Sequence, residues 1–131
     1  MKTNIITIII TLVVSFQINA QQLNQEIAKE SETAYLLGKI DKSGLEGENY
    51  TSWFTKNYED YTTNQTLVNE IASELKTYSI TLFVGTWCGD SKKEVPRLYK
   101  VLGACDFPMD QLTVITVSTA SDMYKQSPQH K

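Results

Sequence analysis

Two apolar, β-branched runs lie in the second half of the chain about one helix length apart, and this spacing restricts the possible folds. Residues 79–85 read SITLFVG and residues 111–118 read QLTVITVS. Both runs predict strands covered on both faces, and the first suits a central strand. Between them, residues 92–102 carry apolar side chains at helical spacing, and Gly103 ends that segment. The order strand, helix, strand predicts a parallel pair joined by a right-handed crossover, and so an α/β fold.

The length and charge of the chain narrow the class of protein further. With 131 residues, of which 41% are hydrophobic, the chain can form one domain with a packed core. Its formal net charge is -3, and no basic block longer than Lys92-Lys93 occurs beyond the first residues. Phosphate binding therefore has little support, and no nucleic-acid partner is predicted.

The first 20 residues have the features of a secretory signal peptide. Lys2 precedes an apolar run of 12 residues at positions 5–16, and the small residue Ala20 stands before a polar stretch. A membrane-spanning helix needs about 20 apolar residues, so this run is short for an anchor. We predict a signal peptide over residues 1–20, a periplasmic or secreted mature protein, and no stable membrane anchor after cleavage.

Residues 21–78 predict a helical N-terminal extension. Apolar residues recur at loosely helical spacing over residues 23–40. A clearer helical pattern spans residues 67–75, and Asn64 or Thr63 can serve as its N-cap. The chain is therefore expected to form helices first and the strand–helix–strand unit second.

Between these two helical patterns, aromatic side chains recur at spacings of three and four. They are Tyr50, Trp53, Phe54, Tyr58 and Tyr61. This spacing gathers them on one side of a helix. An aromatic stripe is more often core than a platform for a sugar or peptide, so we predict core and keep the platform as the alternative.

Cys88 stands where the first predicted strand gives way to the helix, within the segment WCGDS at residues 87–91. Free backbone N–H groups and the helix dipole favour an anion at a helix N-terminus, which lowers the pKa of a thiol placed there. Lys92 and Lys93 in the next turn are expected to help, whereas the charge of Asp90 opposes. Because glycine and two polar residues follow the cysteine, a reactive thiol is predicted in preference to a buried structural one.

The segment TWCGDSKKEVP, residues 86–96, resembles the active-site segment of the thioredoxin-like superfamily. In that superfamily a strand ends in Trp-Cys-Gly-x-Cys and the following helix carries a kinking proline. Trp87 matches the tryptophan, Cys88 the attacking cysteine and Pro96 the helix proline. The resemblance covers residues 79–118.

The resemblance implies that residues 79–131 are a thioredoxin-like core that follows the helical extension. Its site residues are then Cys88 and Ser91 as the catalytic pair, supported by Trp87, Gly89, Asp90 and Pro96. The implied partners are protein or low-molecular-weight thiols and disulfides. No cofactor and no metal are implied.

Ser91 departs from the superfamily, whose dithiol members carry the resolving cysteine at that position. A serine cannot resolve a mixed disulfide, but its hydroxyl lies one turn from Cys88 and can donate a hydrogen bond to the thiolate. The only other cysteine, Cys105, follows a mostly helical segment. About 20 Å then separates the two thiols, whereas a disulfide needs Cα atoms within about 7 Å. The sequence therefore predicts a monothiol mechanism, with Cys105 a structural thiol.

The end of the chain is a second departure. In the thioredoxin fold, a helix and an antiparallel hairpin follow the second strand, and the hairpin begins after a cis-proline. Here the polar run at residues 121–131 follows, and Pro128 within it is not assigned as that proline. We therefore expect an incomplete core without the terminal hairpin and helix, as in a fragment or a truncated reading frame. His130, the single histidine, is expected to be solvated, which leaves no Cys–His pair and no metal site.

Two functions stay open at the level of sequence. The first is a monothiol thiol–disulfide oxidoreductase that works through Cys88. The second is a thioredoxin-like binding module that has lost redox chemistry, in which Ser91 is a degenerate position and Trp87 helps to hold a peptide or partner. The pKa of Cys88 distinguishes them, because only the first needs a stabilised thiolate.

The signal peptide generates a first testable prediction. When the full chain is expressed with its own N-terminus in a bacterium that has a periplasm, the mature protein is expected outside the cytoplasm and begins at Gln21. N-terminal sequencing of the exported protein checks this. A product that keeps Met1 and stays in the cytoplasm contradicts it.

Overall fold

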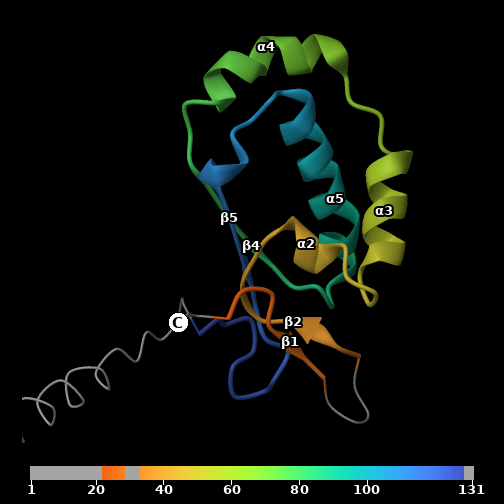
Figure 1. The fold of residues 1–131 in the computed structure, drawn as a ribbon, viewed down its shortest axis with the longest axis vertical. Coiled ribbons are helices and arrows are strands. Elements are labelled where there is room, and N and C mark those ends of the chain that lie inside the picture. The colour runs from red at the N-terminus through yellow and green to blue at the C-terminus, as the bar shows by residue number, and fades with distance from the viewer. Residues whose placement is uncertain (1–21, 29–32, 129–131) are drawn as a thin grey trace, which may run out of the picture.

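A computed structural model of the chain describes residues 22–28 and 33–128 (Figure 1). The predicted signal peptide and His130 lie outside these residues. The elements follow one another as β1 (Glu26–Ile27), β2 (Tyr35–Leu36), β3 (Gly38–Ile40), α2 (Lys42–Leu45), α3 (Thr51–Asp60), α4 (Gln65–Leu75), β4 (Ile80–Val84), α5 (Gly89–Ala104), the short 3-10 helix η1 (Met109–Gln111) and β5 (Leu112–Thr116). The fold is mixed α/β, as the sequence predicted.

The main sheet has three strands in the order β3-β5-β4. β4 and β5 run parallel, from the pair Ile80 and Leu112 to the pair Val84 and Thr116, with α5 between them in the chain. The predicted strand–helix–strand unit with a parallel pair is confirmed. β3 pairs antiparallel with the other side of β5, so β5 is the central strand. β1 and β2 form a separate antiparallel pair.

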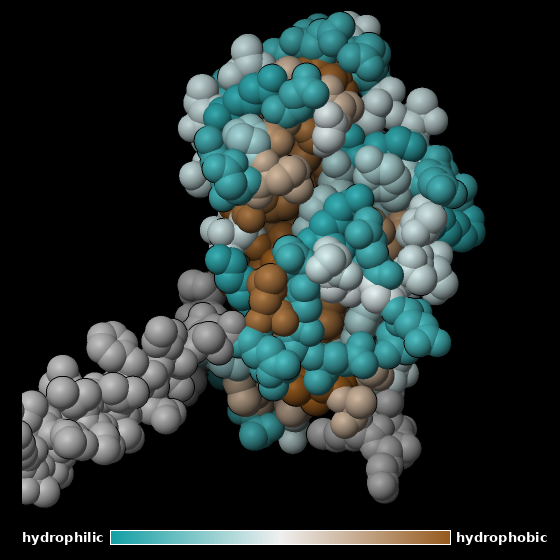
Figure 2. All heavy atoms as spheres, in the orientation of Figure 1, coloured by the Kyte–Doolittle hydropathy of each residue, from teal (hydrophilic) through white to brown (hydrophobic). Residues whose placement is uncertain are grey.

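The prediction that residues 79–85 form a central strand covered on both faces is wrong. β4 lies at the edge of the three-stranded sheet, and its burial alternates along the strand. Val84 is buried, whereas Thr81 is exposed and 53% of Phe83 is accessible to solvent. Figure 2 shows apolar residues as a band through the middle of one face, in the region where Figure 1 draws β4, β5 and α5. A continuous apolar run indicates a strand but does not specify the order of strands in the sheet.

The helix predicted over residues 23–40 is also wrong, because its described parts form β1, β2 and β3. Two residues there adopt the left-handed region, Asn24 with φ 58° and Gly38 with φ 89°. Neither conformation fits inside an α-helix. Leu36 and Ile40 are buried four residues apart, which resembles helical spacing although both lie on strands. Among the described residues of the predicted helical extension over residues 21–78, helices begin at Lys42.

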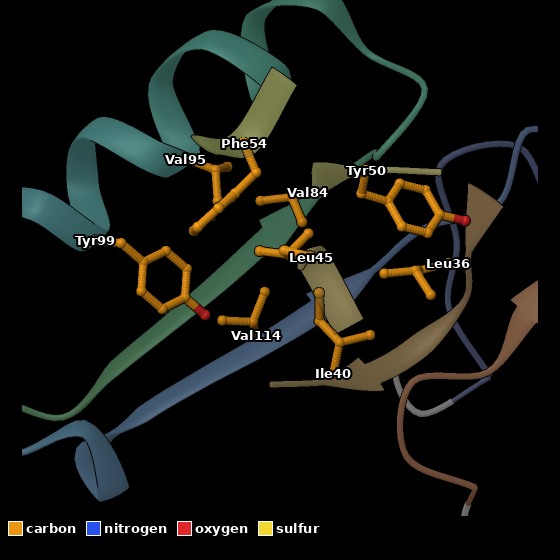
Figure 3. Packing of buried hydrophobic residues seen from close by; sticks show 9 residues of the cluster. All are labelled: Leu36, Ile40, Leu45, Tyr50, Phe54, Val84, Val95, Tyr99 and Val114. Carbon is orange, nitrogen blue, oxygen red and sulfur yellow. The ribbon is translucent and has the colours of Figure 1, made fainter. Parts of the chain in front are cut away.

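The aromatic stripe lies on α3 and on the residue at either end of it, and four of its five members are core rather than an exposed platform. The fifth, Tyr61, follows α3 as its C-cap residue and lies under the Arg97 guanidinium, 5.3 Å from the ring centroid. Tyr50 and Phe54 are buried, and Trp53 and Tyr58 pack against the same cluster. The rings of Phe54 and Tyr99 pack edge to face with their centroids 5.6 Å apart, and this contact joins α3 to α5. Figure 3 shows this cluster, whose buried members are Leu36, Ile40, Leu45, Tyr50, Phe54, Val84, Val95, Tyr99 and Val114. The prediction of core is confirmed for every member of the stripe except Tyr61.

The N-cap predicted for the next helix is confirmed at Asn64. Its side-chain oxygen accepts hydrogen bonds from the backbone N–H groups of Thr66 at 3.1 Å and Leu67 at 3.2 Å. These two bonds satisfy N–H groups that have no partner within the first turn of α4. Asn64 therefore fixes where α4 begins, at the end of the molecule that Figure 1 draws uppermost.

α5 begins three residues earlier than the pattern predicted, at Gly89, and continues through Pro96 to Ala104. Pro96 has no N–H group, so it cannot donate to the carbonyl of Lys92 four residues before it. The side-chain amide of Asn57 on α3 donates to that carbonyl at 3.2 Å and also to the carbonyl of Trp53 at 2.9 Å. Asn57 therefore supplies the hydrogen bond that the proline removes and fastens α3 to α5.

This replacement generates a second prediction. Asn57→Ala is expected to lower the free energy of unfolding by about 1–2 kcal/mol, because the Lys92 carbonyl loses its donor. In a Pro96→Ala background the cost falls by about 0.5–1 kcal/mol, since position 96 regains an N–H that donates to the same carbonyl. Denaturant unfolding of the four proteins measures the coupling. Asn69→Ala, which removes an exposed amide on α4, serves as the matched control. If Asn57→Ala lowers the free energy of unfolding by the same amount with and without Pro96→Ala, the prediction is wrong.

Candidate functional site

The turn between β4 and α5 is shaped by the close approach of the Trp87 indole to Gly85. A Cβ atom at Gly85 would lie 2.7 Å from the indole Cε2 and 2.9 Å from Nε1, so no larger residue fits. The backbone N–H of Cys88 donates to the Gly85 carbonyl at 2.9 Å and closes the turn. The indole N–H donates to the carbonyl of Val117 at 3.1 Å, just beyond β5. This turn delivers Cys88 to the edge of the sheet where both parallel strands end.

Cys88 is the N-cap residue of α5, and its side chain is half-buried. Its carbonyl accepts from the N–H of Lys92 at 3.0 Å, the first helical hydrogen bond. The backbone N–H groups of Ser91 and then Asp90 hydrogen-bond to the thiolate and lower the pKa of Cys88. Partial burial and the Asp90 charge oppose this shift without reversing it. The lowering comes from the helix N-terminus, as the sequence predicted, whereas Lys92 and Lys93, which were expected to help, are not among its causes.

Ser91 contributes to the site in two ways. Its hydroxyl oxygen accepts a hydrogen bond from the backbone N–H of Gly85 at 3.3 Å, which holds the start of α5 against the end of β4. The hydroxyl also donates to the Cys88 thiolate and lowers its pKa further, but by less than the Ser91 backbone N–H does. The side chain thus supports the turn and the thiolate together.

A cavity of about 260 Å³ opens beside Cys88. Its lining comes from the end of β4, the turn, the first turn of α5 and the chain beyond β5, and consists of Phe83, Val84, Gly85, Trp87, Cys88, Ser91, Val117 and Lys125. Three of the predicted site residues, Trp87, Cys88 and Ser91, therefore meet at one hollow. A small group that enters this cavity contacts an apolar wall and lies next to the Cys88 thiol.

The chain beyond β5 forms a loop that sequence reasoning missed. Ser118 and Lys125 hold it together, because the Lys125 N–H donates to the Ser118 carbonyl at 2.9 Å and the Ser118 N–H donates to the Gln126 carbonyl at 2.8 Å. The Tyr124 ring packs on the Trp87 indole with centroids 5.8 Å apart. The only signal in the sequence was a tyrosine in an otherwise polar run. This loop forms the wall of the cavity that faces α5.

The other predicted residues lie outside the cavity. Gly89 and Asp90 are exposed in the first turn of α5, and a Cβ at Gly89 would have no atom within 4 Å apart from its chain neighbours and the backbone of the helix itself. Pro96 is fully buried farther along the helix. Cys105 is the C-cap residue of α5, 1% exposed, so the two free thiols occupy opposite ends of one helix. Cys105 is too far away to pair with Cys88, as predicted from the length of the helix.

A larger hollow of about 600 Å³ lies elsewhere, between β3, α2, α5, η1 and β5. Its lining is mostly apolar and includes the phenol of Tyr99. Burial, and then the negative charges of Asp41 and Glu46, raise the pKa of Tyr99 to about 12, so this phenol stays protonated at neutral pH. None of the described residues that line this hollow is a cysteine or histidine. The smaller cavity, which contains the thiol, is therefore the candidate functional site.

Comparison of the chain with models of known protein families, with curated proteins and with solved structures finds no match. Within residues 22–28 and 33–128, no helix has the length and apolar character needed to cross a membrane. The same part of the chain contains no group of three or more His, Cys, Asp or Glu side chains that could hold a metal ion.

The causes of the Cys88 shift generate a third prediction. Asp90→Asn is expected to lower the pKa of Cys88 further, because it removes the opposing charge and keeps the backbone N–H. Ser91→Ala raises this pKa but leaves it below that of a free thiol, since the larger contribution comes from the backbone. The rate of alkylation against pH, in a Cys105→Ala background, reports the titration. A return to the free-thiol value in Ser91→Ala contradicts the assignment to the backbone.

Proposed function

We propose that this chain is a thioredoxin-like thiol–disulfide exchange protein of an extracytoplasmic compartment, and that it acts through Cys88 alone. One observation carries the proposal: the Cys88 thiol stands at the N-terminus of α5, directly after a parallel strand, beside a cavity, and backbone N–H groups lower its pKa. A thiolate is the nucleophilic form of cysteine, so this placement favours attack on an electrophilic sulfur.

The arrangement around Cys88 agrees with the motif that suggested the superfamily. Trp87 and Cys88 line one cavity, and Pro96 lies inside the helix that follows. β4, α5 and β5 occur in the order expected of the strand–helix–strand unit. Residues 1–20, which have the features of a signal peptide, support the extracytoplasmic location. Disulfides persist in such compartments, so substrates for the exchange would be present there.

The proposed reaction is an exchange of disulfides in two steps. The Cys88 thiolate attacks one sulfur of a disulfide R–S–S–R, a new S–S bond joins Cys88 to that sulfur, and the old bond breaks to release R–S⁻, which takes up a proton. An external thiol R′–SH then attacks, as its thiolate, the R sulfur of the mixed disulfide. R–S–S–R′ forms and Cys88 leaves as a thiolate. One disulfide enters and one leaves, so no further oxidant is needed.

The neighbours of Cys88 have defined tasks in both steps. The N–H groups of Ser91 and Asp90 stabilise the thiolate before attack and again when it leaves. The hydroxyl of Ser91 adds a hydrogen bond but cannot open the mixed disulfide. Cys105 cannot do so either, since it is buried at the far end of α5. The mixed disulfide therefore waits for an external thiol.

A non-catalytic binding module is the second candidate, and one contact favours it. The Ser91 hydroxyl accepts a hydrogen bond from the Gly85 N–H, which gives a serine at this position a structural reason independent of redox chemistry. In that case the cavity beside Trp87 holds a partner group and Cys88 is a bystander. Reactivity of Cys88 separates the two candidates.

The monothiol reaction generates a fourth prediction. On exposure to bis(hydroxyethyl) disulfide, the protein is expected to form a mixed disulfide at Cys88 and to stall until an external thiol is added. Ser91→Cys is expected to release the bound half, because a thiol at that spacing forms a disulfide with Cys88 and completes the dithiol route. Mass spectrometry of the intact protein follows the adduct over time.

Three further variants serve as controls for this experiment. Ser91→Ala also removes the hydroxyl but supplies no thiol, so its adduct stalls as in the unmodified protein. Cys105→Ala keeps the adduct and Cys88→Ser abolishes it. If Cys88 stays unmodified over the pH range where a free thiol reacts, the exchange function fails and the binding module takes its place.

A further inference from the structure

Among the described residues that line the Cys88 cavity, the wall opposite α5 carries one charged side chain, that of Lys125. The other described residues of the lining are apolar or neutral, apart from the thiol itself. Asp90, the nearest acidic residue along the chain, is exposed in the first turn of α5 and does not belong to the lining. In the part of the chain that the structure describes, the cavity therefore combines the Cys88 sulfur, an apolar surface and the Lys125 ammonium group.

Lys125 is held in place by its backbone and by its neighbours. Its N–H donates to the Ser118 carbonyl at 2.9 Å, and its φ of 58° puts it at a fixed left-handed bend of the loop. Ser118 is buried, and its hydroxyl hydrogen-bonds with the hydroxyl of Tyr35 on β2 at 3.2 Å. The loop is thus tied to the body of the protein at the residue that fixes Lys125.

The ammonium group of Lys125 lies over the Tyr124 ring, which in turn packs on Trp87. Its Nζ lies 5.3 Å from the centroid of the Tyr124 ring, and that ring lies 5.8 Å from the Trp87 indole. No carboxylate within the described part of the chain forms an ion pair with Lys125. The positive charge is therefore available to a ligand on the side of the cavity formed by Trp87.

We propose that Lys125 makes the Cys88 cavity selective for small disulfides that carry a carboxylate. This inference rests on the proposed exchange function and names its substrate class. The carboxylate of the bound half lies toward the Lys125 ammonium, its short carbon chain lies against Trp87 and Val117, and its sulfur faces Cys88. Attack then proceeds as above: the Cys88–S bond forms, the disulfide bond breaks, and the other half leaves as a thiolate that takes up a proton.

The volume of the cavity and the net charge of the chain both support a small anionic disulfide as the substrate. Ligand pockets for drug-sized molecules measure about 300–1,000 Å³, so a cavity of about 260 Å³ suits a smaller group. The chain has a formal net charge of -3, so its overall field favours cations and disfavours anions. A preference for an anionic disulfide must therefore come from a local positive charge, which Lys125 supplies.

Three disulfides of similar length test the proposal on the purified full chain: dithiodipropionate, which is anionic, bis(hydroxyethyl) disulfide, which is neutral, and cystamine, which is cationic. The rate of Cys88 modification is expected to be highest for the anion, by about three- to tenfold over the neutral probe, and this ratio shrinks as salt is added. Lys125→Gln removes the preference and Lys125→Glu reverses it. The preference is read as the ratio of the anionic to the neutral rate within each variant, so that a change in the thiolate fraction of Cys88 affects both rates alike and cancels.

Lys93→Gln is the matched control, because it removes the same charge from the exposed face of α5 outside the cavity lining. It is expected to keep the anionic preference. If Lys93→Gln and Lys125→Gln act alike, or if the unmodified protein does not prefer the anion, the proposed role of Lys125 is wrong while the exchange function stands. If Cys88 reacts with none of the three probes, the exchange function fails and the inference about Lys125 falls with it.

Discussion

The parallel pairing of β4 and β5 is the constraint on which the candidate site depends. Parallel strands end at the same edge of a sheet, and the pair Val84 and Thr116 marks that edge. The Val117 N–H donates to the Val84 carbonyl at 2.9 Å and extends the pairing by one residue. The turn that carries Cys88 and the loop that carries Lys125 both leave the sheet there. Without this register, the two walls of the cavity would not face each other.

The packing of α3 on α5 keeps α5, whose N-terminus carries Cys88, helical along its whole length. Pro96 would interrupt α5, but Asn57 donates to the carbonyl that the proline leaves without a partner, and the ring contact of Phe54 with Tyr99 joins the two helices. α5 therefore stays helical through Pro96. Its two ends hold the two cysteines, so an intact helix keeps the thiols apart. The monothiol character of the proposed reaction follows from this continuity as much as from Ser91.

Two kinds of electrostatic interaction act at the cavity, one on the Cys88 thiolate and one, under the proposal, on the substrate. Backbone N–H groups at the start of α5 and the Ser91 hydroxyl stabilise the thiolate through hydrogen bonds. Under the proposal, recognition falls to the full charge of Lys125, whose effect on an exposed carboxylate is screened by salt. Reactivity of the sulfur and choice of substrate can then change independently.

Short-range physics in the sequence was enough for several features. Apolar runs and helical spacing predicted β4, α5 and β5, an amide before an apolar helix predicted the Asn64 cap, and a cysteine between strand and helix predicted the position of Cys88. Each depends on residues a few positions apart. The helix predicted over residues 23–40 was wrong because Leu36 and Ile40 are spaced as on a helix. The segment that contains Ile40 is a strand because it pairs with β5, which is distant in the sequence.

The tertiary structure alone decided the order of the strands and the far wall of the cavity. Tyr35 and Ser118, which anchor the loop, are 83 positions apart, and the indole of Trp87 reaches a carbonyl 30 positions away. No local pattern marks Lys125, because its conformation depends on hydrogen bonds to Ser118 that form only when β5 is in place. The sequence by itself therefore determined where the Cys88 thiol stands, at a helix N-terminus that follows a strand. Which groups face that thiol was decided by contacts between residues that are distant in the chain and meet only in the folded sheet.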